Sequence, residues 1–297
     1  MDQITSAYQH LCAELGLQNI EASLQAEFDL LQKAHDAIHE FMLLAPLCFP
    51  ACIASEISWQ SKSAFLLYQW EVFQHAHRSL MEALGGYYNV AFILLRTALE
   101  LLLKGAFWQC LSHEGFREHS HVLETSKQGR EIQEWLRTII EQAPHVKKEL
   151  DRTSAGIFDK VSSRIEDPAF RVPPRILMQQ LEQWGVLQPV ASTTLYELYQ
   201  TLSADVHVVP DKTDIGRRLV AGTFEPFEQA VVQPSLREYG VRLHGIMDIA
   251  IVVELNIMQD LIGRFESARS KLAERAAVIE QLELRYTLDR IKELLKL

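Results

Sequence analysis

The segment 87–110, YYNVAFILLRTALELLLKGAFWQC, constrains the fold most strongly, because it is apolar on almost every side of a helix. A helix of this kind belongs in the middle of a core. Arg96, Glu100 and Lys104 interrupt it at steps of four residues and form one narrow charged stripe. An unpaired charge is costly to bury, so these residues must be paired or functional. The segment predicts either an internal ladder of ion pairs or a polar site inside a helical bundle.

The composition is that of a folded protein with a large core, since 48% of the 297 residues are apolar. The 29 Lys and Arg residues are outnumbered by 39 Asp and Glu residues, which gives a formal net charge of −10. This charge argues against broad electrostatic adhesion to nucleic acid or to anionic membranes, although it leaves room for a local basic patch. The four cysteines are too few for a disulfide framework and predict reduced thiols in a cytoplasmic protein.

Neither a targeting signal nor a membrane span is expected from the sequence. The first 32 residues contain no Lys or Arg, unlike a secretory signal or an Arg-rich transit peptide. The longest apolar stretches, 90–108 and 246–258, are interrupted by charged residues. Neither is an uninterrupted span of the roughly 20 apolar residues that cross a bilayer. We therefore expect no membrane among the partners.

Apolar residues recur with helical period along most of the chain, and no strand pattern is found. A helix is expected over 19–44, ended by Pro46 and Pro50, and another from Ser55 or Ser58 to residue 84. Gly85-Gly86 predicts a tight reversal into the apolar central helix. Further helices are expected over 131–142, 146–165, 175–184, 193–208 and 236–264. The predicted fold class is all-α, an antiparallel helical bundle.

The expected organisation is a bundle domain over 1–261, with an inserted helical segment at about 112–192, followed by a C-terminal helix over 262–297. Phe265, Leu272, Ile279 and Tyr286 recur at sevens in that last segment, which is rich in Ala, Leu and charges of both signs. This spacing predicts a long amphipathic helix with coiled-coil character. Its apolar side must either fold back on the bundle or pair with another chain. We expect it to pair, most simply in a two-fold homodimer, or to bind a different protein.

A second polar stripe lies on the expected helix 193–208, where Tyr196, Tyr199, Ser203 and His207 share one face. We expect Ser203 and His207 to meet Arg96 and Glu100. A histidine near a helix C-terminus is favoured in its protonated form. The four residues could therefore act as an acid–base site, or they could form a buried network that fixes the register of the helices. Two further residues, Arg217 and Arg218, could hold a phosphate, or pair with the acidic residues around them.

Two of these motifs, LLRTALE (94–100) and YELYQTLSADVH (196–207), resemble paired motifs of a group of prokaryotic helical proteins. That group is similar to the HEPN superfamily of helical nucleotide-binding domains, many of which are ribonucleases of toxin and phage-defence systems. The resemblance spans about 78–212. Arg96 and Glu100 match its Arg-x-x-x-Glu element, and Ser203 and His207 match its Ser-x-x-x-His element. The ribonucleases also carry a His four to six residues after an Arg on one helix, whereas Arg96 is followed there by Glu100, Leu101 and Leu102.

The resemblance implies an RNA- or nucleotide-directed protein, and possible activity as a metal-independent ribonuclease of a defence or toxin-type system. Its catalytic residues would be Arg96, Glu100, Ser203 and His207, and no cofactor is expected. The residues assigned to substrate binding are Lys104, Tyr196, Tyr199, Arg217 and Arg218. The alternative is a non-catalytic helical module for interaction or oligomerisation, in which the polar stripes are structural.

Metal binding is the weaker hypothesis from the sequence. His35 and His39 lie one helical turn apart with Asp36 beside them, and such a pair could ligate one ion. A di-metal bundle needs two Glu-x-x-His motifs on long helices. We found one, Glu118 with His121, in an expected loop. Surface histidines are the preferred interpretation, and no metal site is expected.

Overall fold

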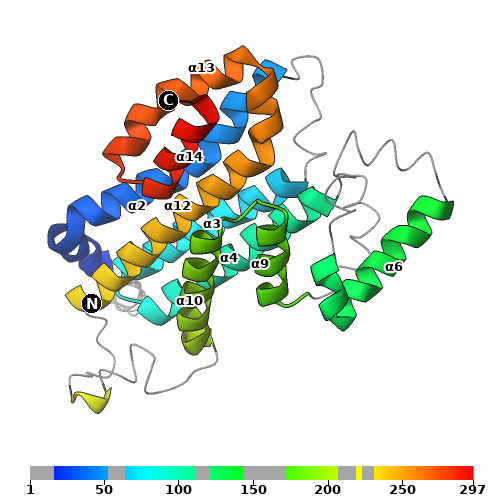
Figure 1. Ribbon diagram of the computed structural model, residues 1–297. Coiled ribbons are helices and arrows are strands. Elements are labelled where there is room, and N and C mark those ends of the chain that lie inside the picture. Colours follow the sequence, from blue (N-terminus) through cyan, green and yellow to red (C-terminus); the bar gives the residue numbers. More distant parts are fainter. Residues whose placement is uncertain are drawn as a thin grey trace, which may run out of the picture.

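The computed structural model describes residues 17–52, 64–111, 121–142, 172–206, 219–222 and 231–296. Within these ranges the regular elements are helices and no strand occurs, which confirms the predicted all-α bundle (Figure 1). None of the helices in these ranges combines the length and the hydropathy that a membrane crossing requires.

The centre of the bundle is the hairpin of α3 (Ala64–Leu84) and α4 (Tyr88–Leu111). As predicted, Gly85 and Gly86 make the reversal, and Gly86 has a φ of 90°, which glycine adopts without strain. The predicted apolar helix is buried along most of its length, with Leu95 and Leu99 fully inaccessible to solvent. Gly105 allows a close approach between the two helices, because a Cβ atom there would lie 2.6 Å from the Cβ of Tyr68.

The first described helix, α2 (Leu17–Cys52), lies alongside this hairpin and departs from helical geometry at Glu27 (φ −143°, ψ 43°). It continues past Pro46 and Pro50, so the prediction that these prolines end the helix is wrong. A proline inside a helix lacks one N–H bond and crowds the carbonyl four residues earlier, but a helix can continue past it with a kink. The start of α2 is tied to the hairpin turn, because Ser23 Oγ donates to the Leu84 carbonyl at 2.8 Å.

The long helix α12 (Gln233–Arg264) completes the bundle by packing on α2 and α4 (Figure 1). Its middle is almost wholly buried and carries the fully buried Glu254. Gln69 of α3 donates to a carboxylate oxygen of Glu254 at 3.1 Å and also contacts the Phe41 carbonyl of α2. This contact joins three helices at the centre of the core.

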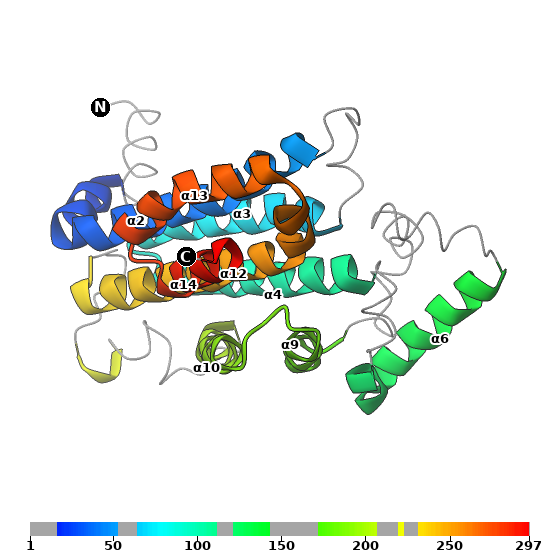
Figure 2. The same ribbon diagram turned by 45° about the horizontal axis from the view of Figure 1, so that its top comes forward.

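Between α4 and α12 the chain forms η2 (His121–Thr125), α6 (Lys127–Gln142), α9 (Pro174–Gln183) and α10 (Pro189–Val206). Figure 2 shows α9 and α10 side by side across one face of α4, while α6 extends away from the bundle. The predicted helix 175–184 is confirmed, and Gly185 follows it with a φ of 72°. The helix expected over 146–165 lies outside the described residues. The packing of α10 on α4 therefore brings the second polar stripe to the charged stripe of α4.

The C-terminal segment differs from the prediction of one long helix. Phe265 has extended geometry (φ −117°, ψ 116°) and separates α12 from α13 (Glu266–Gln281), which a short turn joins to α14 (Arg285–Leu295). Both helices fold back, α13 onto α2 and α14 onto α12 (Figures 1 and 2). Leu272 and Ile279, which were expected to pair with another chain, are fully buried. Folding back removes these two residues of the apolar stripe from water without a partner chain.

Candidate functional site

The two polar stripes meet in part, at the seam between α4 and α10. Arg96 Nη2 lies 3.1 Å from Glu100 Oε1 on the same helix and donates to Tyr199 Oη on α10 at 2.9 Å. The guanidinium carbon also lies 5.0 Å from the centre of the Tyr199 ring. The Arg96 side chain is 13% exposed and that of Glu100 is 27% exposed. The structure thus brings together three of the residues assigned to the site from the sequence.

Ser203 is on the same side of α10, but its hydroxyl is engaged elsewhere. It donates to the Tyr199 carbonyl of its own helix at 2.6 Å. In the part of the chain that the structure describes, Ser203 makes no hydrogen bond to Arg96 or Glu100. His207, which was expected to meet Arg96 and Glu100, lies outside the described residues, as do Arg217 and Arg218.

The other residues assigned to substrate binding lie further along the seam. Lys104 is half-buried on α4, two turns beyond Arg96, and makes no ion pair within the described ranges. Tyr196 is half-buried on α10, with the guanidinium carbon of Arg175 from α9 5.9 Å from its ring centre. Two arginine–tyrosine contacts, Arg96 with Tyr199 and Arg175 with Tyr196, therefore join α10 to α4 and to α9.

The electrostatics of the seam are those of a partly desolvated cation. The Nε atom of Arg96 is buried and has no hydrogen-bond partner among the described residues. A guanidinium group offers five N–H donors, and the two hydrogen-bonding contacts described above both use Nη2. The arrangement holds α10 in register on α4, and the same guanidinium could bind an anion that approaches from the solvent side.

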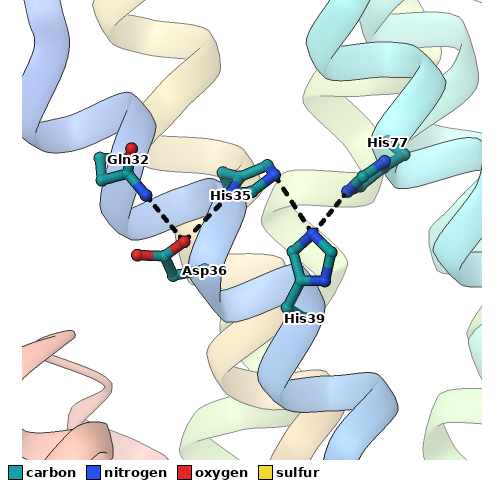
Figure 3. A network of polar contacts seen from close by, with 5 residues as sticks. All are labelled: Gln32, His35, Asp36, His39 and His77. Carbon is teal, nitrogen blue, oxygen red and sulfur yellow. Dashed lines mark hydrogen bonds and ion pairs between the residues drawn. The ribbon is translucent and has the colours of Figure 1, made fainter.

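A second polar cluster, of which the sequence indicated His35 and His39 but not the third member, lies between α2 and α3, whereas α10 packs on α4. His35 and His39 from α2 face His77 from α3 (Figure 3). His39 Nε2 lies 3.2 Å from His35 Nε2 and 3.1 Å from His77 Nε2. One nitrogen from each ring lies within 4.8 Å of the other two. Such a group of imidazoles could hold a metal ion.

Carboxylate and aromatic neighbours orient these histidines. His35 Nδ1 lies 3.0 Å from Asp36 Oδ1, which also accepts from Gln32 Nε2 at 2.8 Å (Figure 3). Burial raises the pKa of Asp36, but the bonds from Gln32 and His35 outweigh it and the net shift is downward. His77 stacks on Phe73, with ring centres 4.7 Å apart. Burial, with His39 and His35 nearby, lowers the pKa of His77 and favours its neutral form.

The sequence favoured surface histidines for His35 and His39, and both keep part of their exposure in the structure. Both are half-buried and contact each other, and His77 was not connected to them from the sequence. The signal that could have found it is the pair His75 and His77 on the next expected helix. Only the packing of α2 against α3 shows that His77 faces the cluster, while His75 Nδ1 is 2.8 Å from the Glu71 carbonyl of its own helix.

The ribonucleases carry an Arg and a His on one helix, and α12 holds such a pair about two turns apart, Arg237 and His244. This pair was not singled out from the sequence. Arg237 Nε lies 3.9 Å from a carboxylate oxygen of Glu27. His244 Nε2 lies 2.8 Å from the Leu282 carbonyl in the turn between α13 and α14. These contacts hold α2 and the C-terminal turn on α12, so both residues have structural partners.

Comparisons of the chain with models of known protein families, with curated proteins and with solved structures found no match. The resemblance to HEPN proteins therefore stays a prediction from the two motifs. The function has to be argued from the geometry of the seam and of the histidine cluster.

Proposed function

We propose that the protein is an RNA- or nucleotide-directed helical protein whose site is the α4–α10 seam. The observation that carries this proposal is the contact of Arg96 with Tyr199 across two helices that are distant in sequence. Arginine is suited to phosphate because its planar fork of donors matches phosphate oxygens. Tyrosine rings give bases a surface for stacking. The half-buried Lys104 and Tyr196 extend the same pattern along the seam.

The ribonuclease form of the proposal is metal-independent and assigns proton transfer to His207. When the ribose 2′-oxygen forms a bond to phosphorus, the bond from phosphorus to the 5′-oxygen breaks. The step needs a base for the hydroxyl proton, a cation for the developing charge and a proton for the leaving 5′-oxygen, which water can supply. Arg96 would supply the cation. Glu100 would hold Arg96 in position through the ion pair between them. In this form of the proposal, the protein is the ribonuclease of a defence or toxin-type system.

The test is binding and cleavage of single-stranded RNA by the full chain without added metal. Arg96→Ala should weaken RNA binding by about 1–3 kcal/mol, the cost of losing one stacking or bidentate contact. Tyr199→Phe removes only the hydroxyl that Arg96 uses, so its effect should be smaller. The matched control is Arg78→Ala, because Arg78 forms the same i,i+4 pair with Glu82 on α3, where Arg78 is 67% exposed. If the unmodified chain binds neither RNA nor nucleotides, the proposal is wrong.

Cleavage is tested separately from binding. His207→Ala should abolish cleavage while RNA binding and the melting temperature stay close to those of the unmodified chain. Binding without cleavage in the unmodified chain would support a nucleotide-directed function and rule out the ribonuclease form.

The second candidate is a non-catalytic helical module, in which the seam only fixes helix register. The observation that favours it is that the Ser203 hydroxyl is used by its own helix. A protein partner or a second copy would then meet the exposed side of the C-terminal helices, where Tyr286 is 37% exposed. Light scattering would show whether the chain is a homodimer. This candidate is favoured if Arg96→Ala strongly lowers the melting temperature and neither the variant nor the unmodified chain binds RNA.

A further inference from the structure

The cluster of His35, His39 and His77 is built across two packed helices rather than along one surface. His35 and His39 are one turn apart on α2, and His77 reaches them from α3 (Figure 3). Buried side chains on the same two helices, including Ile38 and Ala76, hold these backbones in place. The positions of the three rings are therefore set by the core of the bundle, which is the condition for a preorganised ligand set.

The spacing of the nitrogens fits one small cation. An ion with nitrogen ligands at about 2.0–2.1 Å in tetrahedral geometry places those nitrogens about 3.3–3.4 Å apart. The two Nε2 separations around His39 are 3.2 Å and 3.1 Å. All three nitrogens lie within 4.8 Å of one another, and rotation of the rings about their side-chain bonds can adjust these separations when an ion binds.

Hydrogen bonds among the three rings cannot satisfy all of their facing nitrogen atoms. The carboxylate of Asp36 accepts from His35 Nδ1, so a neutral His35 keeps its proton there and presents a lone pair at Nε2. His39 Nε2 faces both this lone pair and the Nε2 of His77. One ring nitrogen carries at most one proton or one lone pair, so it can serve only one of its two neighbours well. A cation that accepts all three lone pairs removes the conflict.

The surroundings are those of a metal-binding histidine. Ligating imidazoles usually donate their other ring N–H to a carboxylate or carbonyl, which fixes the tautomer and the orientation of the ring. Asp36 takes this role for His35, and Gln32 in turn donates to Asp36 at 2.8 Å. Three imidazoles suit Zn²⁺, Cu²⁺ and Ni²⁺, whereas Mg²⁺ and Ca²⁺ require oxygen ligands.

We propose that His35, His39 and His77 bind one divalent transition-metal ion, with Zn²⁺ as the first choice and with a fourth coordination position open to water. The open position follows from the exposure of the cluster, since the side chain of His35 is 40% exposed. Three protein ligands with one open position are the pattern of sites where an ion acts on a bound molecule, whereas structural zinc sites use four protein ligands. The site is separate from the α4–α10 seam, so it does not depend on the function proposed for the seam.

The test is a titration of the full chain, stripped of metal with a chelator and dialysed, with Zn²⁺ in a calorimeter and with Co²⁺ in a spectrophotometer. We expect one ion per chain, and visible absorption of Co²⁺ of the intensity that four-coordinate geometry gives. His39→Ala and His77→Ala should each weaken binding by at least about tenfold. Asp36→Asn should weaken binding by about 10–100-fold, the range found for residues that orient a ligand.

The matched control is His75→Ala, because His75 is on the same helix as His77, two residues away, and contacts its own backbone instead of the cluster. Its affinity for Zn²⁺ should equal that of the unmodified chain. Circular dichroism checks the fold of each variant, and His77→Gln replaces His77→Ala if the alanine variant does not fold. Absence of stoichiometric binding by the unmodified chain, or equal losses in the His75 and His77 variants, would overturn the proposal.

Discussion

Replacing Asp248 with alanine should release the last helix, α14, from the bundle. Asp248 belongs to α12 and is 5% exposed, and its two carboxylate oxygens accept from the backbone N–H groups of Thr287 at 2.8 Å and Tyr286 at 3.1 Å. The residue before α14 is Leu284, which cannot cap the helix with its own side chain. Asp248 therefore acts as an N-cap supplied from another helix, and its charge also meets the positive end of the α14 dipole.

The magnitude follows from these two bonds. A hydrogen bond to a charged group contributes about 1.5–3 kcal/mol, and loss of an N-cap costs about 0.5–2 kcal/mol. Because both contacts act on one helix end and are not independent, we expect Asp248→Ala to lower the free energy of unfolding by about 2–4 kcal/mol. Asp248→Asn keeps one acceptor oxygen and should lose about half as much.

The assay is urea unfolding followed by circular dichroism, combined with hydrogen exchange of the amides in α14. Exchange in α14 should accelerate in Asp248→Ala before exchange in α3 and α4 does, because α14 can detach locally. The control is Asp289→Ala, since Asp289 is an exposed acidic residue on α14 itself. A loss below about 0.5 kcal/mol for Asp248→Ala, the level of an ordinary surface substitution, would refute this role.

Two further substitutions test the packing of the helices. Arg275→Ala leaves the carboxylate of Glu40, which is 5% exposed, without its partner, and should lower the free energy of unfolding in urea by about 3 kcal/mol. Adding Glu40→Gln should recover part of this loss, and no recovery would contradict the explanation. Gly105→Ala forces a Cβ atom to 2.6 Å from the Cβ of Tyr68 and should destabilise the fold by about 1–2 kcal/mol. Its control is Gly245→Ala on α12, where a Cβ would meet nothing within 4 Å, and this change should be neutral or stabilise the fold by up to about 1 kcal/mol.

Local features of the sequence were sufficient to predict the helices and their main reversal. The apolar period around residues 87–110 marked α4 as a core helix, and it is buried as expected. Gly85 and Gly86 marked the turn because a positive φ suits glycine. The pair Arg96–Glu100 was also predictable, since residues four apart are neighbours on any helix. These features depend on neighbours within two turns of the chain, and the sequence contains that information directly.

Contacts between distant segments were decided only by the tertiary structure. Tyr199 reaches Arg96 from 103 residues away, and His77 reaches His39 from 38 residues away. The C-terminal stripe was correctly seen as a surface that must be covered, but its spacing did not distinguish a second chain from the same chain. Phe265 interrupts the helix and Asp248 caps α14, so most of the stripe packs against α2 and α12. An amphipathic pattern specifies that a face is buried, whereas the partner that buries it depends on how the whole chain packs.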